Sequence, residues 1–192
     1  MTRIFIALEL DTAMQQHLGG VIDRMERELP ALRWVDPLGI HLTVAFLGEL
    51  TDARVEEAIQ ATIVAARQVS PFDYRLTHLG VFGAIRQPRV IWMGIEEPTG
   101  TLVRLHERLK GELQRSGFEL EMRPFSPHIT LSRVKNPLNP AEQQTIQRLL
   151  NDSELQAPSP NYHVKQISVM KSELSRAGAK YTSLRDCALG RN

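Results

Sequence analysis

The chain of 192 residues carries 23 Lys and Arg against 22 Asp and Glu, a formal net charge of +1. It is therefore no polycation, and only a local basic patch could attract nucleic acid. No apolar run approaches the roughly 20 residues that cross a bilayer, so no membrane association is expected. The single Cys187 cannot pair within the chain, and the first residues form no secretory leader, which together predict a cytoplasmic protein.

The first half of the chain is predicted to alternate strands and helices. Segments with apolar residues at every second position or in short runs indicate strands, and spacings of three and four indicate helices. Asp11 or Thr12 can cap the first helix, and Thr51 with Asp52 the second. In chain order we expect a strand at 3–9, a helix that ends near Pro30, a strand at 41–47 and a helix that begins at 52.

The second half contains two predicted hairpins with helices between them. Thr99 or Thr101 can cap the helix that Gly117 ends. The elements expected are strands at 73–82 and 89–95 joined by the loop GAIRQP, that helix, a strand at 128–133, a helix at 141–150, and a last hairpin of 162–174 and 180–189 turning through SRAGA.

The recognisable strand pairs are hairpins, which favours an α+β protein over a doubly wound parallel sheet. Each half has one strand with an unusual polar pair and at least one amphipathic helix. Because no linker rich in Gly or Ser interrupts the chain, we expect residues 1–192 to form a single domain of two packed lobes.

The two unusual strands repeat one pattern. His41 and Thr43 open the segment HLTVAFLG, and His128 and Thr130 lie in SPHITLSRV. Because side chains alternate across a strand, each histidine shares a face with its threonine, and the apolar neighbours take the other face. Two such strands facing one cleft would bring two imidazoles and two hydroxyls together.

That set of groups suits phosphodiester chemistry without a metal. One imidazole can take a proton from attacking water while the other gives a proton to a departing ribose oxygen. Histidine has an ordinary pKa of about 6.5, which allows one neutral and one protonated partner near neutral pH. The hydroxyls of Thr43 and Thr130 can hydrogen-bond the nonbridging phosphoryl oxygens.

Several alternatives stay open from the residues alone. The two histidines can be structural, satisfied side chains of the strands. Arg133 points to the apolar face by strict alternation and is then an ordinary exposed residue at a strand end, but a bulge would turn it toward the cleft, where a guanidinium binds phosphate. The aromatic residues Trp34, Phe46, Phe82 and Trp92 can stack a nucleobase, although such residues are more often core.

The remaining histidines are assigned no function. His17 and His106 lie in helical patterns and are expected on the surface, whereas His78 and His163 lie in strands without a threonine two positions later. No HExxH motif, cysteine pair or spaced cluster completes a zinc site, so no metal or other cofactor is expected. Arg86, Arg89, Arg123 and Arg133 are candidates for a local basic patch.

With both motifs in hand, the chain resembles the 2H phosphoesterase superfamily, named for two His-x-Thr/Ser motifs. It is most similar to the bacterial and archaeal RNA 2′,3′-cyclic phosphodiesterases, also called the LigT or ThpR family of 2′-5′ RNA ligases. The similarity covers nearly the whole chain, through RIFIALEL, RVIWMGI, RPFSPHITLSR and MKSELSRAGAKYTSL. Before the first motif, the chain has Gly39-Ile40 where the family more commonly has asparagine and leucine. This difference does not affect the proposed proton-transfer groups.

The resemblance implies a bilobal α+β fold, with two antiparallel sheets flanking a central cleft and helices on the outer faces. It implies an enzyme that opens 2′,3′-cyclic phosphate ends of RNA or nucleotides to 2′-phosphomonoesters. Nothing in the sequence demands more than a monomer, so a monomer is expected. His41 and His128 are then the catalytic acid and base, and Thr43, Thr130 and Arg133 bind phosphate. Our hypothesis takes His41 as the acid and His128 as the base, an assignment that the sequence does not decide. The alternatives are a 2′-5′ RNA ligase that joins RNA halves, and a noncatalytic module that binds RNA ends or nucleotides.

Overall fold

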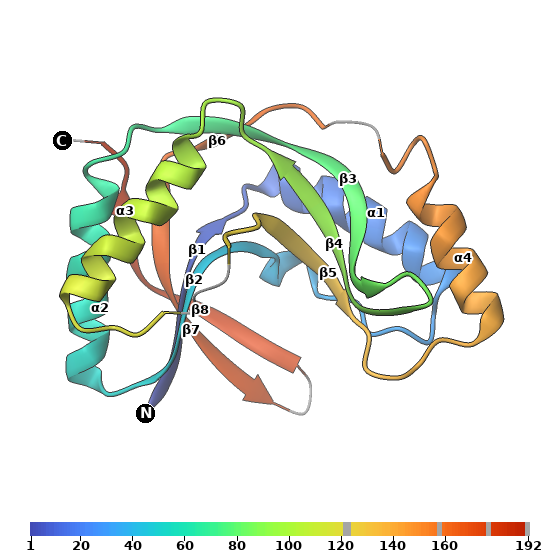
Figure 1. Ribbon diagram of the computed structural model, residues 1–192, viewed down its shortest axis with the longest axis horizontal. Helices are drawn as coiled ribbons and strands as arrows, with labels where there is room; N and C mark the ends of the chain where they lie inside the picture. Colours follow the sequence, from blue (N-terminus) through green and yellow to red (C-terminus); the bar gives the residue numbers. More distant parts are fainter. Residues whose placement is uncertain (121–123, 157–158, 176–177, 191–192) are drawn as a thin grey trace.

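The computed structural model describes residues 1–120, 124–156, 159–175 and 178–190. Within them, eight strands form one curled antiparallel sheet in the order β6-β3-β4-β5-β2-β1-β7-β8 (Figure 1). The strands are β1 (Thr2–Glu9), β2 (His41–Leu50), β3 (Phe72–Ala84), β4 (Gln87–Glu96), β5 (His128–Arg133), β6 (Tyr162–Val164), β7 (Gln166–Ser175) and β8 (Gly178–Ala188). The expected α+β class is confirmed.

The sheet consists of two four-stranded halves that meet at one point. Strands β6, β3, β4 and β5 form one half, and β2, β1, β7 and β8 form the other. In the described part of the chain, the central strands β2 and β5 pair only through Leu42 and Ile129, both fully buried. The two sheets implied by the resemblance are therefore the halves of one continuous sheet.

Four helices in the described residues cover the sheet in pairs (Figure 1). Helices α2 (Asp52–Ala66) and α3 (Thr101–Arg115) pack on each other, and α2 also contacts β2, β7 and β8. Helices α1 (Thr12–Glu28) and α4 (Pro140–Leu150) lie on the half that contains β3. Each of these helices therefore buries its apolar stripe against one half of the sheet, and the four leave the other face of the sheet uncovered.

Most helix caps are the residues predicted from the sequence. Asp11 caps α1 by accepting from the Met14 backbone N–H at 2.8 Å, and Thr51 caps α2 in the same way. The expected threonine cap of α3 is wrong: Gly100 occupies the cap with φ of 71°. The Glu97 carboxylate accepts instead from the backbone N–H of Thr99 and of Leu102, so a carboxylate upstream of the helix replaces the threonine hydroxyl.

Two strand predictions also need correction. The β3–β4 hairpin turns tightly through residues 85–86, because both strands extend further into GAIRQP than their apolar pattern indicates. Residues 162–164 do not begin the last hairpin; as β6 they pair with Phe72–Tyr74 at the far edge of the sheet. The β7–β8 hairpin itself is confirmed, while part of its predicted turn, residues 176–177, lies outside the described residues.

Alternation along the central strands separates a core face from an open face. Leu42, Val44, Ile129 and Leu131 point to the helices and are at most 4% exposed. The face on the other side carries His41, Thr43, His128 and Thr130, and we call it the open face. In the half formed by β2, β1, β7 and β8, a small second cluster of Phe5, Ala7 and Met170 is buried on the open face beneath Tyr181.

Candidate active site

The two His-x-Thr segments meet at the junction of the sheet halves. Antiparallel pairing of Leu42 with Ile129 sets His41 on the side of Thr130 and Thr43 on the side of His128. The two segments are thus related by a local twofold axis through this residue pair. All four polar side chains share the open face, because their strand neighbours on either side are buried on the core face.

A β-bulge follows each threonine. In β2 the register with β1 shifts at Val44, and in β5 the register with β4 shifts at Leu131, in each case one residue after the threonine. The second bulge brings Arg133 back to the open face, since Ser132 pairs with the buried Ile91 and Arg133 with the half-exposed Val90. The bulge that the sequence left as one of two possibilities is therefore present.

The local twofold axis makes Phe46 the counterpart of Arg133, because each lies three residues after its threonine and two after its bulge. Phe46 is 44% exposed, and the guanidinium of Arg3 lies over its ring at 5.0 Å from the centroid. The two repeats thus present the same histidine and threonine but different residues at the third position.

Both imidazoles are held by the same short contact. Nδ1 of His41 lies 2.9 Å from the Gly39 carbonyl oxygen, and Nδ1 of His128 lies 2.7 Å from that of Ser126. A carbonyl oxygen only accepts, so each Nδ1 carries the proton of this hydrogen bond. Each neutral ring therefore has its lone pair at Nε2, the nitrogen available for proton transfer.

The pKa of His41 is shifted by its surroundings. Burial lowers it, because burial disfavours the charged imidazolium, and the positive charge of Arg133 lowers it further. The hydrogen bond to Gly39 opposes these effects in part. Because β5 runs antiparallel to β2 at Leu42 and Ile129, Arg133 lies on the His41 side of the junction, away from its own histidine.

Aromatic side chains surround each histidine. The His41 ring lies 4.6 Å from that of Phe5 and 4.8 Å from that of Tyr181. The His128 ring meets Phe82 edge-on at 4.7 Å and lies 6.4 Å from Trp92. Two of the aromatic residues singled out from the sequence, Phe82 and Trp92, are thus beside a histidine.

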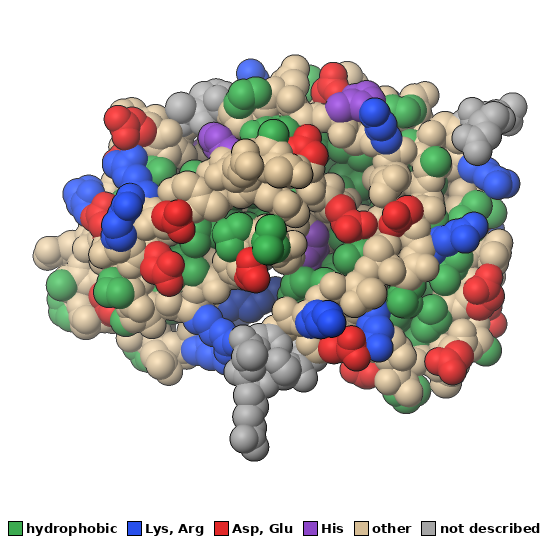
Figure 2. Space-filling model, turned by 180° about the vertical axis from the view of Figure 1, so that it is seen from behind, with side chains coloured by type: hydrophobic (Ala, Val, Ile, Leu, Met, Phe, Trp, Pro, Cys, Tyr) green, Lys and Arg blue, Asp and Glu red, His purple; other side chains and the backbone are tan. Residues whose placement is uncertain are grey.

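Other residues singled out from the sequence lie elsewhere. Trp34 packs against the core and donates from Nε1 to the Leu29 carbonyl oxygen. His106 is half-buried rather than fully on the surface, as its ring stacks on Phe125 at 4.1 Å and burial lowers its pKa. Arg123 lies outside the described residues. Lys and Arg side chains are visible along the lower edge of a hollow in the molecule, which also shows a histidine (Figure 2).

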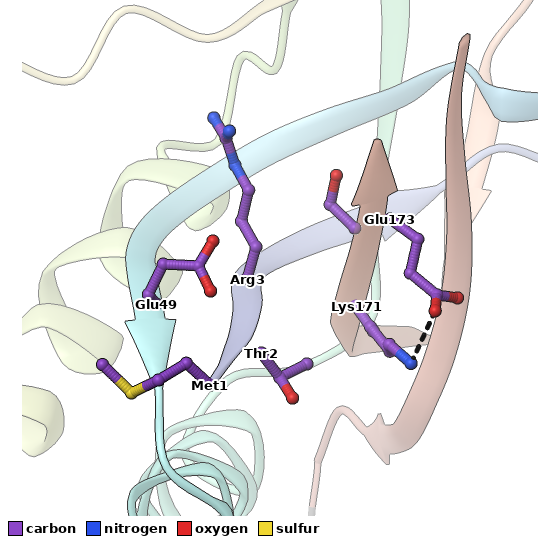
Figure 3. A pocket seen from close by; sticks show the side chains of 7 residues that line it. Met1, Thr2, Arg3, Glu49, Lys171 and Glu173 are labelled. Atoms are coloured by element: carbon purple, nitrogen blue, oxygen red, sulfur yellow. Dashed lines mark ion pairs between the residues drawn. The ribbon is translucent and has the colours of Figure 1, made fainter. Parts of the chain in front are cut away.

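A separate pocket of about 310 Å³ opens at the outer end of β1 (Figure 3). It is lined by Thr2, Arg3, Glu49, Lys171 and Glu173, among others, and Lys171 forms an ion pair of 2.9 Å with Glu173. None of the described histidines lines this pocket. Among the described residues, no group of three or more His, Cys, Asp or Glu side chains is arranged to hold a metal ion.

Sequence reasoning missed several neighbours of the two histidines. Tyr181 comes from the other end of the chain, and only the β1–β7–β8 pairing brings it to His41. His78 was set aside because no threonine follows it, although it lies 5.4 Å from Trp92. Both positions depend on strand register, for which the sequence contains no local signal.

An antiparallel α+β fold with two twofold-related His-x-Thr segments on one open face defines a class of two-histidine proteins. The profile of the 2′-5′ RNA ligase superfamily matches residues 14–176. An RNA 2′,3′-cyclic phosphodiesterase of Methanothermobacter thermautotrophicus is 30% identical over 185 residues, which cover 95% of this chain and 96% of that protein. The chain belongs to the 2′-5′ RNA ligase superfamily.

Solved structures agree with that membership. A Thermus thermophilus protein superposes with a TM-score of 0.80 at 26% identity, over 99% of both chains. Escherichia coli LigT, in a complex with 3′-AMP, superposes with a TM-score of 0.71 at 28% identity, over 98% of both chains. In the described part of this chain, no helix is long and apolar enough to span a membrane.

Proposed function

We propose that this protein is an RNA 2′,3′-cyclic phosphodiesterase that opens cyclic phosphate ends to 2′-phosphomonoesters. The observation that carries the proposal is the pair of twofold-related histidines, each with Nδ1 bonded to a carbonyl and Nε2 left for the open face. The relative from M. thermautotrophicus has that activity in its name, and E. coli LigT binds a nucleotide.

In the proposed reaction, His41 and His128 are the acid and base. Nε2 of one ring takes a proton from water as the water oxygen bonds to phosphorus. Nε2–H of the other ring gives its proton to O3′ as the bond from phosphorus to O3′ breaks, which leaves a 2′-phosphate and a 3′-hydroxyl. Both transfers use Nε2, the nitrogen that the carbonyl contacts leave unbonded.

The phosphate-binding groups in this proposal are Thr43, Thr130 and Arg133. The two hydroxyls flank the junction on the open face and can donate to the two nonbridging oxygens. The Arg133 guanidinium adds a positive charge close to His41, where the phosphate carries its negative charge. These groups bind the anion without a metal ion.

Phosphorus NMR tests the proposal directly. In EDTA, the parent protein should convert adenosine 2′,3′-cyclic phosphate to the 2′-monoester, and His41→Ala or His128→Ala should each lower the rate by at least about 10²-fold. His17→Ala, an exposed histidine of α1, is the matched control and should keep the parent rate. Equal turnover in the parent and in both active-site variants would refute the assignment.

The superfamily name supports a second candidate, a 2′-5′ RNA ligase that joins RNA halves by the reverse type of transfer. Incubating RNA halves with a 2′,3′-cyclic phosphate end and a 5′-hydroxyl end distinguishes the two. A joined product that forms faster than the 2′-monoester would favour ligation. Binding of RNA ends without turnover in either assay would favour a noncatalytic module.

We further propose that residues 1–192 act as one bilobal domain, as a monomer in the cytoplasm. Cys187 is buried and unpaired, and burial raises the pKa of its thiol to about 11. With this single cysteine the chain can form no disulfide of its own, which is the usual state of proteins in a reducing compartment. Size-exclusion chromatography with light scattering measures the oligomeric state.

A further inference from the structure

A β-bulge in β3 lies beside the β4 residue that pairs with His128. Leu76 pairs with Ile95 and Leu79 with Met93, so Thr77 and His78 together lie opposite the single residue Gly94. Gly94 in turn pairs with His128 on its other side. His78, Gly94 and His128 therefore form a row across three adjacent strands.

Gly94 shows on which face the His78 ring lies. A Cβ atom built on Gly94 would come within 2.6 Å of Thr77 Oγ1 and within 3.2 Å of His78 Cε1. Paired residues of adjacent strands point to the same face, so that Cβ would lie on the face that carries the His128 side chain. The His78 imidazole thus occupies the space of a missing side chain on the open face, next to His128.

Two further rings complete the surroundings of His78. The Trp92 ring lies across Gly80, where a Cβ atom would meet Trp92 Cζ2 at 2.2 Å. The Trp92 centroid is 5.4 Å from those of His78 and Phe82, and Phe82 contacts His128. We call His78, Phe82 and Trp92 the aromatic cluster.

The charged residues at the His78 end of the aromatic cluster neutralise each other, whereas Arg133 lies at the Phe82 end, where Val90 pairs with both Phe82 and Arg133. Arg75 and Glu96, which pair one step further along β3 and β4, form an ion pair with Nε of Arg75 at 2.6 Å from Oε2 of Glu96. A phosphate group needs a cation or several donors, whereas a nucleobase needs flat rings and a hydrogen-bonding group at its edge. The aromatic cluster fits the second kind of ligand.

We propose that His78 is a specificity-determining residue that contacts the base of the terminal nucleotide. This inference rests on the proposed function. Two strand spacings, about 10 Å, separate His78 from His128 along the row. A nucleoside is long enough to span this distance, whereas the cyclic phosphate group is not. His78 is an exposed residue whose Nδ1 lies 3.1 Å from Thr77 Oγ1. In the proposed complex its Nε2 meets the edge of the base while Phe82 and Trp92 contact the face of the base.

The test compares substrates with and without a base. For adenosine 2′,3′-cyclic phosphate, His78→Ala should raise KM about 3- to 10-fold with kcat unchanged, as expected for a lost hydrogen bond and ring contact. For methyl riboside 2′,3′-cyclic phosphate, which has no base, the same variant should behave as the parent. The matched control is His163→Ala, an exposed histidine bonded to Asp73 at the sheet edge.

Three outcomes would overturn the proposal. An equal rise in KM for both substrates would show that His78 acts on the phosphate or on the fold. A fall in kcat at constant KM would give it a part in proton transfer. Unchanged KM and kcat for both substrates would show that His78 does not contact the substrate.

A binding measurement separates this inference from the proposed function. Titration of 2′-AMP and of ribose 2-phosphate, followed by tryptophan fluorescence, requires no turnover. His78→Ala should raise the Kd for 2′-AMP about 3- to 10-fold and leave the Kd for ribose 2-phosphate unchanged, even if the parent protein hydrolyses nothing. Equal weakening of both ligands, or of neither, would overturn the base contact whatever the assay of hydrolysis shows.

Discussion

The two histidines share one orienting contact but differ in environment. A backbone carbonyl two residues earlier in the chain fixes the tautomer of each ring, a task for which many active sites use a carboxylate. Only the His41 ring lies between Phe5 and Tyr181 with its pKa lowered by burial and by Arg133.

Replacing Arg133 should move one limb of the pH profile. The guanidinium lowers the pKa of His41, so Arg133→Gln should raise that pKa and shift the corresponding limb of kcat/KM to higher pH. If His41 is the acid, the limb that shifts is the alkaline one, where the acid loses its proton. Initial rates measured between pH 5 and pH 9 give the profile.

Arg89→Gln, an exposed arginine of the neighbouring strand β4, is the control. It should leave both limbs in place. A shift of the acidic limb in Arg133→Gln would reverse the roles of the two histidines, and a profile without any shift would remove Arg133 from the surroundings of His41.

The hydroxyl of Thr130 can be tested without disturbing its strand. Thr130→Val keeps the β-branched shape but cannot donate to a phosphoryl oxygen, so kcat/KM should fall by about 10- to 100-fold, the cost of one hydrogen bond to a charged group. Thr130→Ser keeps the hydroxyl and should stay within about 3-fold of the parent. A loss in Thr130→Ser with parent-like activity in Thr130→Val would show that the methyl group, and not the hydroxyl, is needed.

At the scale of elements, the β-bulges decide which side chains reach the site. One extra residue in β5 turns Arg133 to the open face, and one in β3 places His78 opposite Gly94. Without them, strict alternation would send Arg133 to the core face. The strands supply the histidines and threonines, and the bulges supply the residues around them.

The sequence alone predicted which side chains share a strand face, but not which strands pair with each other. Alternation placed His41 with Thr43 and His128 with Thr130, because that pattern is local to a few residues of one strand. The positions of His78 and Tyr181 depend on which strands pair and in what register, and the side chains of distant segments decide that. For the same reason, residues 162–164 looked continuous with β7 but pair with β3.

Helix α4 depends on a capping box. The Asn139 side chain accepts from the Glu142 backbone N–H at 2.9 Å, and Glu142 accepts from the Asn139 backbone N–H at 2.8 Å. Asn139→Ala should lower the free energy of unfolding by about 1 kcal/mol, as measured by urea denaturation. Asn136→Ala, an exposed residue of the preceding loop, should change it by less than about 0.5 kcal/mol, and equal effects would contradict a capping role.

At the scale of the whole molecule, the two halves of the sheet depend on a small contact. Each half carries one His-x-Thr segment, and within the described residues the strand pairing between the halves joins Leu42 to Ile129. Both side chains are fully buried on the core face. The distance between the proposed catalytic groups is therefore set by packing at one junction.

Leu42→Ala should weaken both the fold and the catalytic arrangement. The cavity should cost about 2–5 kcal/mol of unfolding free energy. Leu109→Ala, in the equally buried core of α3, should cost a similar amount and serves as the control. At a temperature where both variants are folded, kcat should fall in Leu42→Ala alone. Equal kcat values would show that the junction does not set the spacing of the histidines.

The local twofold axis raises the question of how such a site distinguishes the two ribose oxygens. In a 2′,3′-cyclic phosphate, O2′ and O3′ lie almost symmetrically about phosphorus. The two histidines and the two threonines of the site are also related by the local twofold axis. Two equivalent halves would break either bond. The choice between the two bonds must therefore come from positions that the repeat does not share. Along the open face of β2 and β5, the first such position after the threonines is Phe46 in one repeat and Arg133 in the other.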